Sequence, residues 1–213
     1  MILAVLASFF VSLLIVSNVI AGKLLQIGDW VMPAGILAYP ITFLVSDTIA
    51  EVYGRKTTTK VIWVGFATSL LMVVIIYIAR ISPSAVFWEN QEAFDAILGS
   101  VPRIVLASMV AYLVSQHHDV VAFHLWKNYT KGKHLWLRNN ASTMISQAFD
   151  TGLFVTIAFI GTLDSTILVN MILTQYALKI LIAIVDTPLV YFLVSYVRRL
   201  EKNGPYEQVS KRL

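Results

Sequence analysis

The chain has 213 residues, of which 58% are hydrophobic and 13% charged, and its mean hydropathy is +0.75. Soluble globular domains carry about 25% charged residues, so this composition excludes a soluble fold. A membrane-spanning helix needs about 20 apolar residues, which leaves room for about six spans and no separate catalytic domain. The chain has no cysteine, which excludes disulfides and thiolate metal sites. Basic residues near the ends of apolar runs account for the net charge of +4, so we expect no nucleic-acid partner.

The apolar runs predict an all-α integral membrane protein, a bundle of six transmembrane helices that forms a single domain over residues 1–213. The expected spans are residues 2–25, 36–53, 61–79, 103–126, 135–160 and 166–197. No basic leader or cleavage pattern marks the first run, so we expect a retained helix. The second span is short and proline-interrupted, which is typical of a discontinuous helix. The acidic stretch between the third and fourth spans predicts an amphipathic helix on the membrane surface.

Basic residues are concentrated in the segments that follow the second, fourth and sixth spans. These residues are Arg55, Lys56 and Lys60, then Lys127, Lys131 and Lys133, then Arg198, Arg199, Lys202, Lys211 and Arg212. The loops on the other side carry the acidic residues Glu89, Glu92, Asp95 and Asp164. Cytoplasmic loops carry an excess of Lys and Arg, so we expect a multi-pass protein of the bacterial inner membrane with both termini in the cytoplasm.

Several ionisable residues lie inside the predicted spans, where a charged group costs several kcal/mol unless it is paired or hydrated. They are Asp47, Glu51, Asp119, Asp150, Lys179 and Asp186. Lys179 and Asp186 are seven positions apart and therefore share one helix face. The acids outnumber the buried bases, which indicates that the surplus binds a solute cation, a proton or a hydrogen-bond donor. A single buried Ser or Gln, in contrast, is better explained by helix packing.

Three other kinds of site are disfavoured by the residue pattern. His117 and His118 point about 100° apart on a helix, so they make a poor metal site. No glycine-flanked serine marks a nucleophile elbow, which argues against an intramembrane hydrolase. No Walker pattern is present, so the chain does not use ATP directly. We therefore expect no enzymatic activity, no metal and no cofactor.

Motifs along nearly the whole chain carry a family resemblance. They are Tyr39-Pro40, Thr42-Phe43-Leu44, Asp47, Glu51, Tyr53-Gly54, Arg103, Ala107-Ser108, Ala111-Tyr112, Gln116, Asp119, Asn140-Ala141-Ser142, Asp150-Thr151 and Lys179. In order and topology this set resembles the queuosine-precursor transporters, also called vitamin-uptake-like transporters. The resemblance implies a six-helix inner-membrane carrier that imports 7-cyano-7-deazaguanine or 7-aminomethyl-7-deazaguanine, the precursors of the tRNA base queuosine.

Such a cargo fits the polar residues of the spans. A carboxylate can accept the ring N–H and the exocyclic amine of a deazaguanine together, while Lys, Gln or Asn can donate to its carbonyl. The predicted substrate contacts are Tyr39, Phe43, Asp47, Asp119, Asn140, Gln147, Asp150 and Lys179, with the two aromatic residues as stacking walls. Coupling or structural roles are predicted for Glu51, Arg103 and Asp186.

The sequence leaves the mode of transport open. The leading hypothesis is a stand-alone secondary carrier, coupled to protons through one of the buried acids. The alternative is a substrate-capture subunit of a vitamin or nucleobase uptake system, which needs a separate energising module. An intramembrane enzyme acting on lipid or peptide is a third, weaker hypothesis. Beyond the deazaguanine and membrane lipid, the sequence allows a homo-oligomer but does not require one.

Overall fold

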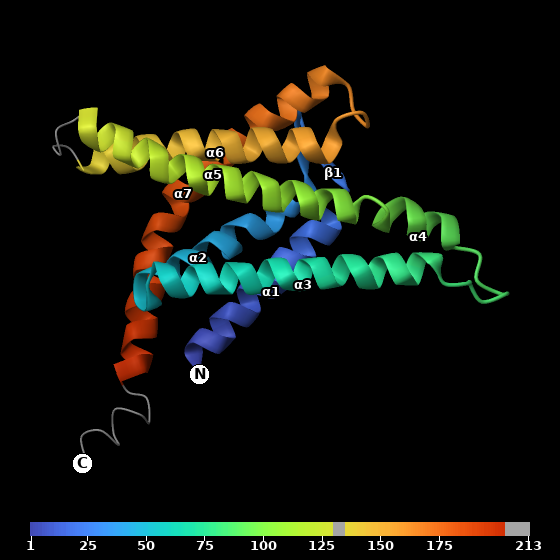
Figure 1. The fold of residues 1–213 in the computed structure, drawn as a ribbon, viewed down its shortest axis with the longest axis horizontal. Helices are drawn as coiled ribbons and strands as arrows, with labels where there is room; N and C mark the ends of the chain where they lie inside the picture. Colours follow the sequence, from blue (N-terminus) through green and yellow to red (C-terminus); the bar gives the residue numbers. More distant parts are fainter. Residues whose placement is uncertain (130–134, 203–213) are drawn as a thin grey trace, which may run out of the picture.

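The computed structural model describes the backbone of residues 1–129 and 135–202 and the side chains of residues 1–118 and 144–201. In chain order the elements are α1 (Ile2–Ile20), β1 (Leu24–Ile27), β2 (Trp30–Pro33), the 3₁₀ helix η1 (Ala34–Ala38), α2 (Tyr39–Tyr53), α3 (Arg55–Ile81), α4 (Gln91–Leu98), α5 (Val101–Tyr129), α6 (Leu135–Phe159) and α7 (Ser165–Lys202). Figure 1 shows the long helices α3, α5 and α6 running side by side, with α7 crossing behind them.

Five helical segments in the described part of the chain are long and apolar enough to cross a membrane. They are Ile2–Ile20, Ala34–Tyr53, Arg55–Ile81, Gln91–His118 and Ser165–Glu201, while Met144–Phe159 of α6 is apolar but shorter. Large apolar side chains such as Phe9 and Leu71 are more than half exposed on the outer surface, as lipid-facing residues are. The structure thus confirms a helical, multi-pass membrane protein, while the count of six spans stays a prediction.

A short β-hairpin follows α1, which the sequence analysis did not predict. α1 ends at Ile20, and the expected continuation of the first span to residue 25 is replaced by the antiparallel strands β1 and β2. Gly28 at the turn has a φ of 61°, a left-handed conformation that suits glycine. The alternating pattern of these strands is only four residues long, too short to be distinguished from the end of a helix by periodicity.

The second span begins differently from the predicted proline-interrupted helix. Pro40 lies in the first turn of α2, where its missing N–H would have no partner within the helix. The proline therefore starts the helix, and the discontinuity lies earlier, in η1. A Cβ on Gly35 of η1 would lie 2.9 Å from Ser17 Oγ, so only glycine lets η1 approach α1 this closely. Ser17 Oγ also donates a hydrogen bond of 3.1 Å to the Gly35 carbonyl.

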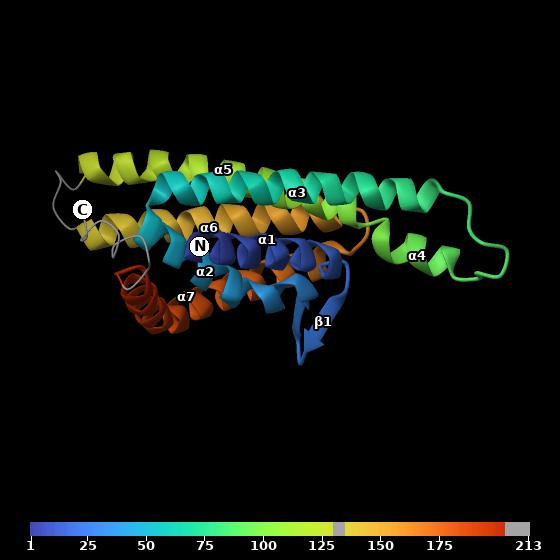
Figure 2. The ribbon, with the colours of Figure 1, turned by 90° about the horizontal axis from the view of Figure 1, so that it is seen from below.

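The predicted surface helix corresponds to α4, an eight-residue helix with no buried side chain. Figure 2 shows α4 beyond the main bundle, next to the end of α3. Arg80 Nε and Asp95 Oδ1 lie 2.7 Å apart and join the two helices, and Gln91 donates to the other oxygen of Asp95 at 2.9 Å.

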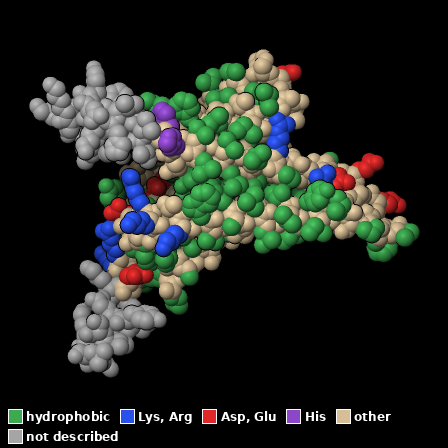
Figure 3. Space-filling view, in the orientation of Figure 1, with side chains coloured by type: hydrophobic (Ala, Val, Ile, Leu, Met, Phe, Trp, Pro, Cys, Tyr) green, Lys and Arg blue, Asp and Glu red, His purple; other side chains and the backbone are tan. Residues whose placement is uncertain are grey.

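Two apolar clusters pack the bundle at opposite ends. One joins Ala21 after α1 to α5, α6 and α7 through Ile104, Val155 and Met171, with β1 and β2 packed against it. The other joins α1, α2 and α7 through Phe10, Ile49 and Val197, with α3 packed against it. The Lys and Arg side chains gather at the second end in Figure 3, whereas the acidic residues of α4 lie at the far end. The charge distribution thus has the polarity that an oriented membrane protein requires.

Asn170 ties the hairpin to α7. Its Oδ1 accepts a hydrogen bond of 3.1 Å from the Val31 N–H, and its Nδ2 donates one of 2.9 Å to the Asp29 carbonyl. A hydrogen bond contributes about 1 kcal/mol net to stability. We therefore expect Asn170→Ala to lower the free energy of unfolding in detergent by about 2 kcal/mol, measured by denaturant titration. Asn90→Ala is the matched control, because the Asn90 side chain makes no capping bond and is exposed. Equal stability of the two variants would contradict this account of the hairpin.

Candidate functional site

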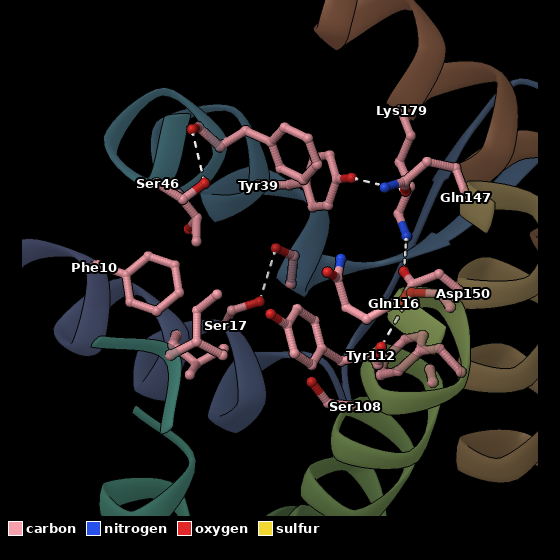
Figure 4. A pocket seen from close by; sticks show the side chains of 18 of the residues that line it. Phe10, Ser17, Tyr39, Ser46, Ser108, Tyr112, Gln116, Gln147, Asp150 and Lys179 are labelled. Carbon is pink, nitrogen blue, oxygen red and sulfur yellow. Dashed lines mark hydrogen bonds and ion pairs between the residues drawn. The ribbon is translucent and has the colours of Figure 1, made fainter. Parts of the chain in front are cut away.

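The helices enclose a cavity of about 540 Å³. It is lined by residues of α1, η1, α2, α3, α5, α6 and α7, so its wall is assembled from segments far apart in the sequence. Figure 4 shows Tyr39, Gln147, Asp150 and Lys179 turned toward one another on one side of this cavity, with Phe10 and Ser17 of α1 on another side. Its volume lies within the range of about 300–1,000 Å³ that small-molecule sites occupy.

The cavity is open at one end of the bundle. Arg55, Thr58 and Thr59 at the start of α3 line it there, and Arg55 and Thr59 are exposed. Figure 3 shows a hollow beside the Lys and Arg side chains at this end. Toward the other end the cavity reaches Ala21 and Pro33, both buried beside the first apolar cluster. The accessible mouth therefore lies at the basic end.

An ion pair joins α6 and α7 at the cavity wall. Lys179 Nζ lies 2.6 Å from Asp150 Oδ2, and the exposed fractions of the two side chains are 7% and 22%. In a low-dielectric environment each charge needs the other, because removal from water costs several kcal/mol per ion. Asp150 is thus largely neutralised by Lys179, and its second oxygen and the remaining ammonium hydrogens are the groups left for a solute.

Tyr39 connects this ion pair to α2. Its hydroxyl donates a hydrogen bond of 3.2 Å to Gln147 Oε1, and Lys179 Nζ lies 5.0 Å from the centre of its ring. The Phe43 ring lies one turn further along α2, with its centroid 4.4 Å from that of Tyr39 and a tilt of 33°. This arrangement fixes Tyr39 through both its hydroxyl and its ring face and places an aromatic surface in the cavity wall.

Asp47 differs from Asp150 in its surroundings. It lines the cavity from α2 and is exposed to it. Within residues 1–118 and 144–201, no group donates a hydrogen bond to its carboxylate and no base pairs with it; the ionisable side chains close enough to interact with it electrostatically are Tyr39 and another acid, Asp186. A carboxylate with free acceptor sites in a water-accessible cavity is available to a donor group of a solute.

Six of the eight predicted substrate contacts line this cavity. Their roles in substrate binding stay predictions. They are Tyr39, Phe43, Asp47, Gln147, Asp150 and Lys179. The side chains of Asp119 and Asn140, the other two, lie outside the described residues. His118, beside Asp119 in the sequence, lies 3.1 Å from Ser146 Oγ through its Nδ1, so it joins α5 to α6.

The residues predicted for coupling or structure do not line the cavity. Arg198 Nη2 lies 3.1 Å from Glu51 Oε1, in an exposed ion pair between α7 and α2. Arg103 donates to the Ile157 carbonyl at 2.7 Å and also to the Ile160 carbonyl, which satisfies the C-terminal end of α6. Asp186 is buried in α7 and is not among the residues that line the cavity. Glu51 and Arg103 thus have structural contacts that account for them.

The structure also adds cavity residues that the predicted site did not include. The polar ones are Ser17, Asn18, Thr42, Ser46, Tyr112, Ser115, Gln116, Ser146 and Gln175. Gln175 Nε2 is buried without a hydrogen-bond partner among the described residues, and the side chain is 4% exposed. Gln175 lies four positions before Lys179, so helical spacing from a predicted site residue would have found it. The described side chains contain no cluster of three His, Asp or Glu residues that could hold a metal ion.

Comparison with known sequences places the chain in a family. A profile described as "Putative vitamin uptake transporter" matches residues 33–193. The chain is 30% identical over 158 residues to a "Probable queuosine precursor transporter" of Bacillus subtilis (strain 168), which covers 74% of this chain and 69% of that protein. It is 28% identical over 130 residues to a protein of the same name from Haemophilus influenzae (strain ATCC 51907 / DSM 11121 / KW20 / Rd), covering 61% of this chain and 53% of that relative. No solved structure matches the chain.

With this match, the multi-pass helical bundle and its internal cavity belong to a membrane transporter and not an enzyme. The chain belongs to the vitamin uptake transporter family, whose curated relatives include queuosine precursor transporters. The family resemblance predicted from the motifs is thereby confirmed. The chain spans about half the length of the Haemophilus influenzae relative, so the matched region is the part that this likeness describes.

The buried ion pair gives a prediction about stability. Lys179→Met leaves Asp150 without its counter-charge, so we expect a loss of about 3 kcal/mol in the free energy of unfolding, measured in detergent. The double variant Lys179→Met with Asp150→Asn removes both charges and should recover at least half of that loss. As a control, Arg80→Met breaks the more exposed pair with Asp95 and should lower the free energy of unfolding much less, because solvent screens that pair. A double variant no more stable than Lys179→Met would show that the two charges do not compensate each other.

Proposed function

We propose that this chain is a carrier of the bacterial inner membrane with six spans and cytoplasmic termini, and that it imports the queuosine precursors 7-cyano-7-deazaguanine and 7-aminomethyl-7-deazaguanine for tRNA modification. The observation that carries the proposal is the free Asp47 carboxylate in the cavity, close to the aromatic pair of Tyr39 and Phe43. The names of the two relatives support the same class of substrate.

The cavity offers each type of contact that a deazaguanine needs. The base is flat and presents a ring N–H next to an exocyclic amine, two donors that one carboxylate accepts together. No described residue donates to the oxygens of Asp47, whereas one oxygen of Asp150 is held by Lys179. The ring faces of Tyr39 and Phe43 provide a stacking surface, because base–aromatic stacking contributes about 1–3 kcal/mol per base.

The carbonyl side of the base requires hydrogen-bond donors. Lys179 has ammonium hydrogens beyond the one directed to Asp150, and Gln147 Nε2 is free to donate while its Oε1 accepts from Tyr39. Both side chains line the cavity on the wall formed by α6 and α7. In this proposal the deazaguanine lies between Asp47 on α2 and these donors. Asp47 accepts from its ring N–H and exocyclic amine, while Lys179 and Gln147 donate to its carbonyl.

The orientation proposed for the protein follows from its charges. The basic residues at the start of α3 and the end of α7 lie at the end where the cavity opens. If that end is cytoplasmic, as the excess of Lys and Arg favours, the structure is an inward-facing state. The cavity is then positioned to release a precursor into the cytoplasm after its passage from the outside.

A direct test is uptake of labelled 7-cyano-7-deazaguanine by vesicles that contain the purified chain and no other protein. We expect saturable uptake by the natural sequence. Asp47→Asn replaces an acceptor of two hydrogen bonds with an amide, and a hydrogen bond to a charged group is worth about 1.5–3 kcal/mol. The apparent affinity should therefore fall by about 10- to 100-fold.

Glu51→Gln is the matched control for Asp47→Asn. Both acids lie on α2, four positions apart, but Glu51 points to Arg198 and not into the cavity. Its uptake should stay within about twofold of the natural protein, since a surface ion pair contributes little. Equal uptake by both variants would show that Asp47 does not take part in substrate binding. Tight binding of the base without vesicle uptake would favour the capture-subunit alternative, and no binding would reject this substrate class.

A further inference from the structure

Asp186 is a buried acid that the substrate site does not use. It lies on α7 with an exposed fraction of 6%, and its Oδ2 has no hydrogen-bond partner among the described residues. Lys179, two helical turns earlier on α7, is engaged with Asp150, and Arg198, further along the same helix, is engaged with Glu51. No base on the described part of the chain is therefore paired with Asp186.

The groups around Asp186 do not compensate a negative charge. From α2, Asp47 and Tyr39 are close enough to interact with it electrostatically, and Glu51 of the same helix is held by Arg198. From α6, the described ionisable group is Asp150, which Lys179 neutralises. β2, which also packs on α7, has no titratable side chain in Trp30–Pro33. Asp186 thus has a second carboxylate within electrostatic range and no counter-charge among the described residues.

A buried, unpaired carboxylate is unfavourable when charged, because no solvent or donor replaces its lost hydration. Two carboxylates close together oppose each other's ionisation in addition. One proton on Asp186 removes both costs, since the neutral acid group carries no charge and its O–H can donate to a nearby acceptor. The conformation in the structure is therefore one that suits a protonated Asp186.

Asp186 also lies close to a proline inside α7, which runs as one helix from Ser165 to Lys202. Pro188 follows two positions later, and its missing N–H leaves the Ile184 carbonyl without its normal helical partner. Figure 1 shows the C-terminal part of α7 directed away from α6, toward the end of the chain. Before Pro188, Ile167, Met171 and Ile172 of α7 pack in the first apolar cluster; after it, Leu193 and Val197 pack in the second. Pro188 thus lies between two parts of α7 that pack in different clusters.

We propose that Asp186, with Asp47 opposite it on α2, is the proton-binding site through which this carrier uses an inward proton gradient, and that α7 changes its bend at Pro188 as the proton leaves. This inference rests on the proposed function. A bound deazaguanine that donates hydrogen bonds to Asp47 favours the ionised form of that acid. The proton therefore stays on Asp186 while the substrate is bound. The step transfers one proton to a carboxylate oxygen from the outer side and returns it to water on the inner side, with no other bond made or broken.

The test uses vesicles that contain the full chain, with the membrane potential held at zero by potassium and valinomycin. With the outside one pH unit more acidic, one proton moving with each substrate sustains about a tenfold accumulation of labelled 7-cyano-7-deazaguanine, because tenfold corresponds to about 1.4 kcal/mol. We expect that ratio for the natural sequence and a ratio near one for Asp186→Asn. Exchange of 7-cyano-7-deazaguanine inside the vesicles for the same compound outside needs no net proton movement. This exchange should therefore continue in Asp186→Asn.

Asp164→Asn is the matched control, because Asp164 is an exposed acid before α7 and lies outside both the cavity and the proposed proton site. It should accumulate substrate as the natural protein does. A ratio near ten for Asp186→Asn would overturn the proposal. Exchange without any response of the natural protein to the pH gradient would also overturn it, while leaving the transport function intact. No exchange at all by the natural protein would instead reject the proposed function.

A second measurement does not depend on the folding of a variant. Addition of unlabelled 7-cyano-7-deazaguanine to vesicles of the natural protein that contain a trapped pH indicator should acidify the interior, because each imported base brings a proton. Acidification that saturates with the same concentration dependence as uptake supports the proposal. An unchanged internal pH during measurable uptake would contradict it, whatever the behaviour of Asp186→Asn.

Discussion

The pairing of Lys179 with Asp150 is the interaction on which the arrangement of the interior depends. A hydrocarbon environment cannot hydrate an isolated charge, so the ammonium and the carboxylate must meet wherever the two helices that carry them are placed. This requirement sets the register of α6 against α7, since the two atoms lie 2.6 Å apart. The same ammonium lies over the Tyr39 ring, so the register of α2 is linked to it as well. One charged pair thus orients three of the helices that line the cavity.

The remaining wall is shaped by small residues that allow close approach. Gly35 brings η1 onto α1 at Ser17, and a larger side chain there would separate the two segments. Gly65 on α3 is a less strict requirement, because a Cβ there would lie 2.9 Å from the end of the Leu14 side chain of α1, which can move aside. Between these closely packed segments and the ion pair of α6 and α7, the helices lie further apart and polar side chains face an open volume. The cavity is therefore the space between the Lys179–Asp150 pair on one side and α1 with its close neighbours on the other.

The sequence allowed a helical, multi-pass membrane protein to be predicted, because a membrane requires a length of apolar residues that few other structures need. It could not show that Asp47 faces the cavity while Glu51, four positions later, pairs outside it with Arg198. Both acids lie on nearly the same face of α2, and only the packing of α7 separates their surroundings. Gln175 was missed for a related reason, since a buried amide in a span is equally consistent with helix contact.

The hairpin also escaped prediction, because its strands are too short for an alternating pattern to be recognised and its anchor, Asn170, lies far away in the sequence. Pro40, in contrast, was recognised as important but was assigned the wrong effect, since a proline in the first turn begins a helix as readily as one in the middle breaks it. In both cases the conformation depends on contacts with distant parts of the chain. The local sequence could identify the hairpin region and Pro40 as unusual, but it could not predict the structure that each adopts.

The attachment of the hairpin to α7 has a mechanical consequence. The strands β1 and β2 continue directly from α1, and Asn170 holds β2 and the turn to the first half of α7. The first helix, the hairpin and the start of the last helix are therefore connected to one another. A passage that opens at this end must either move these three segments together or break the two hydrogen bonds of Asn170. The rate of opening there thus depends on contacts between residues more than a hundred positions apart in the sequence.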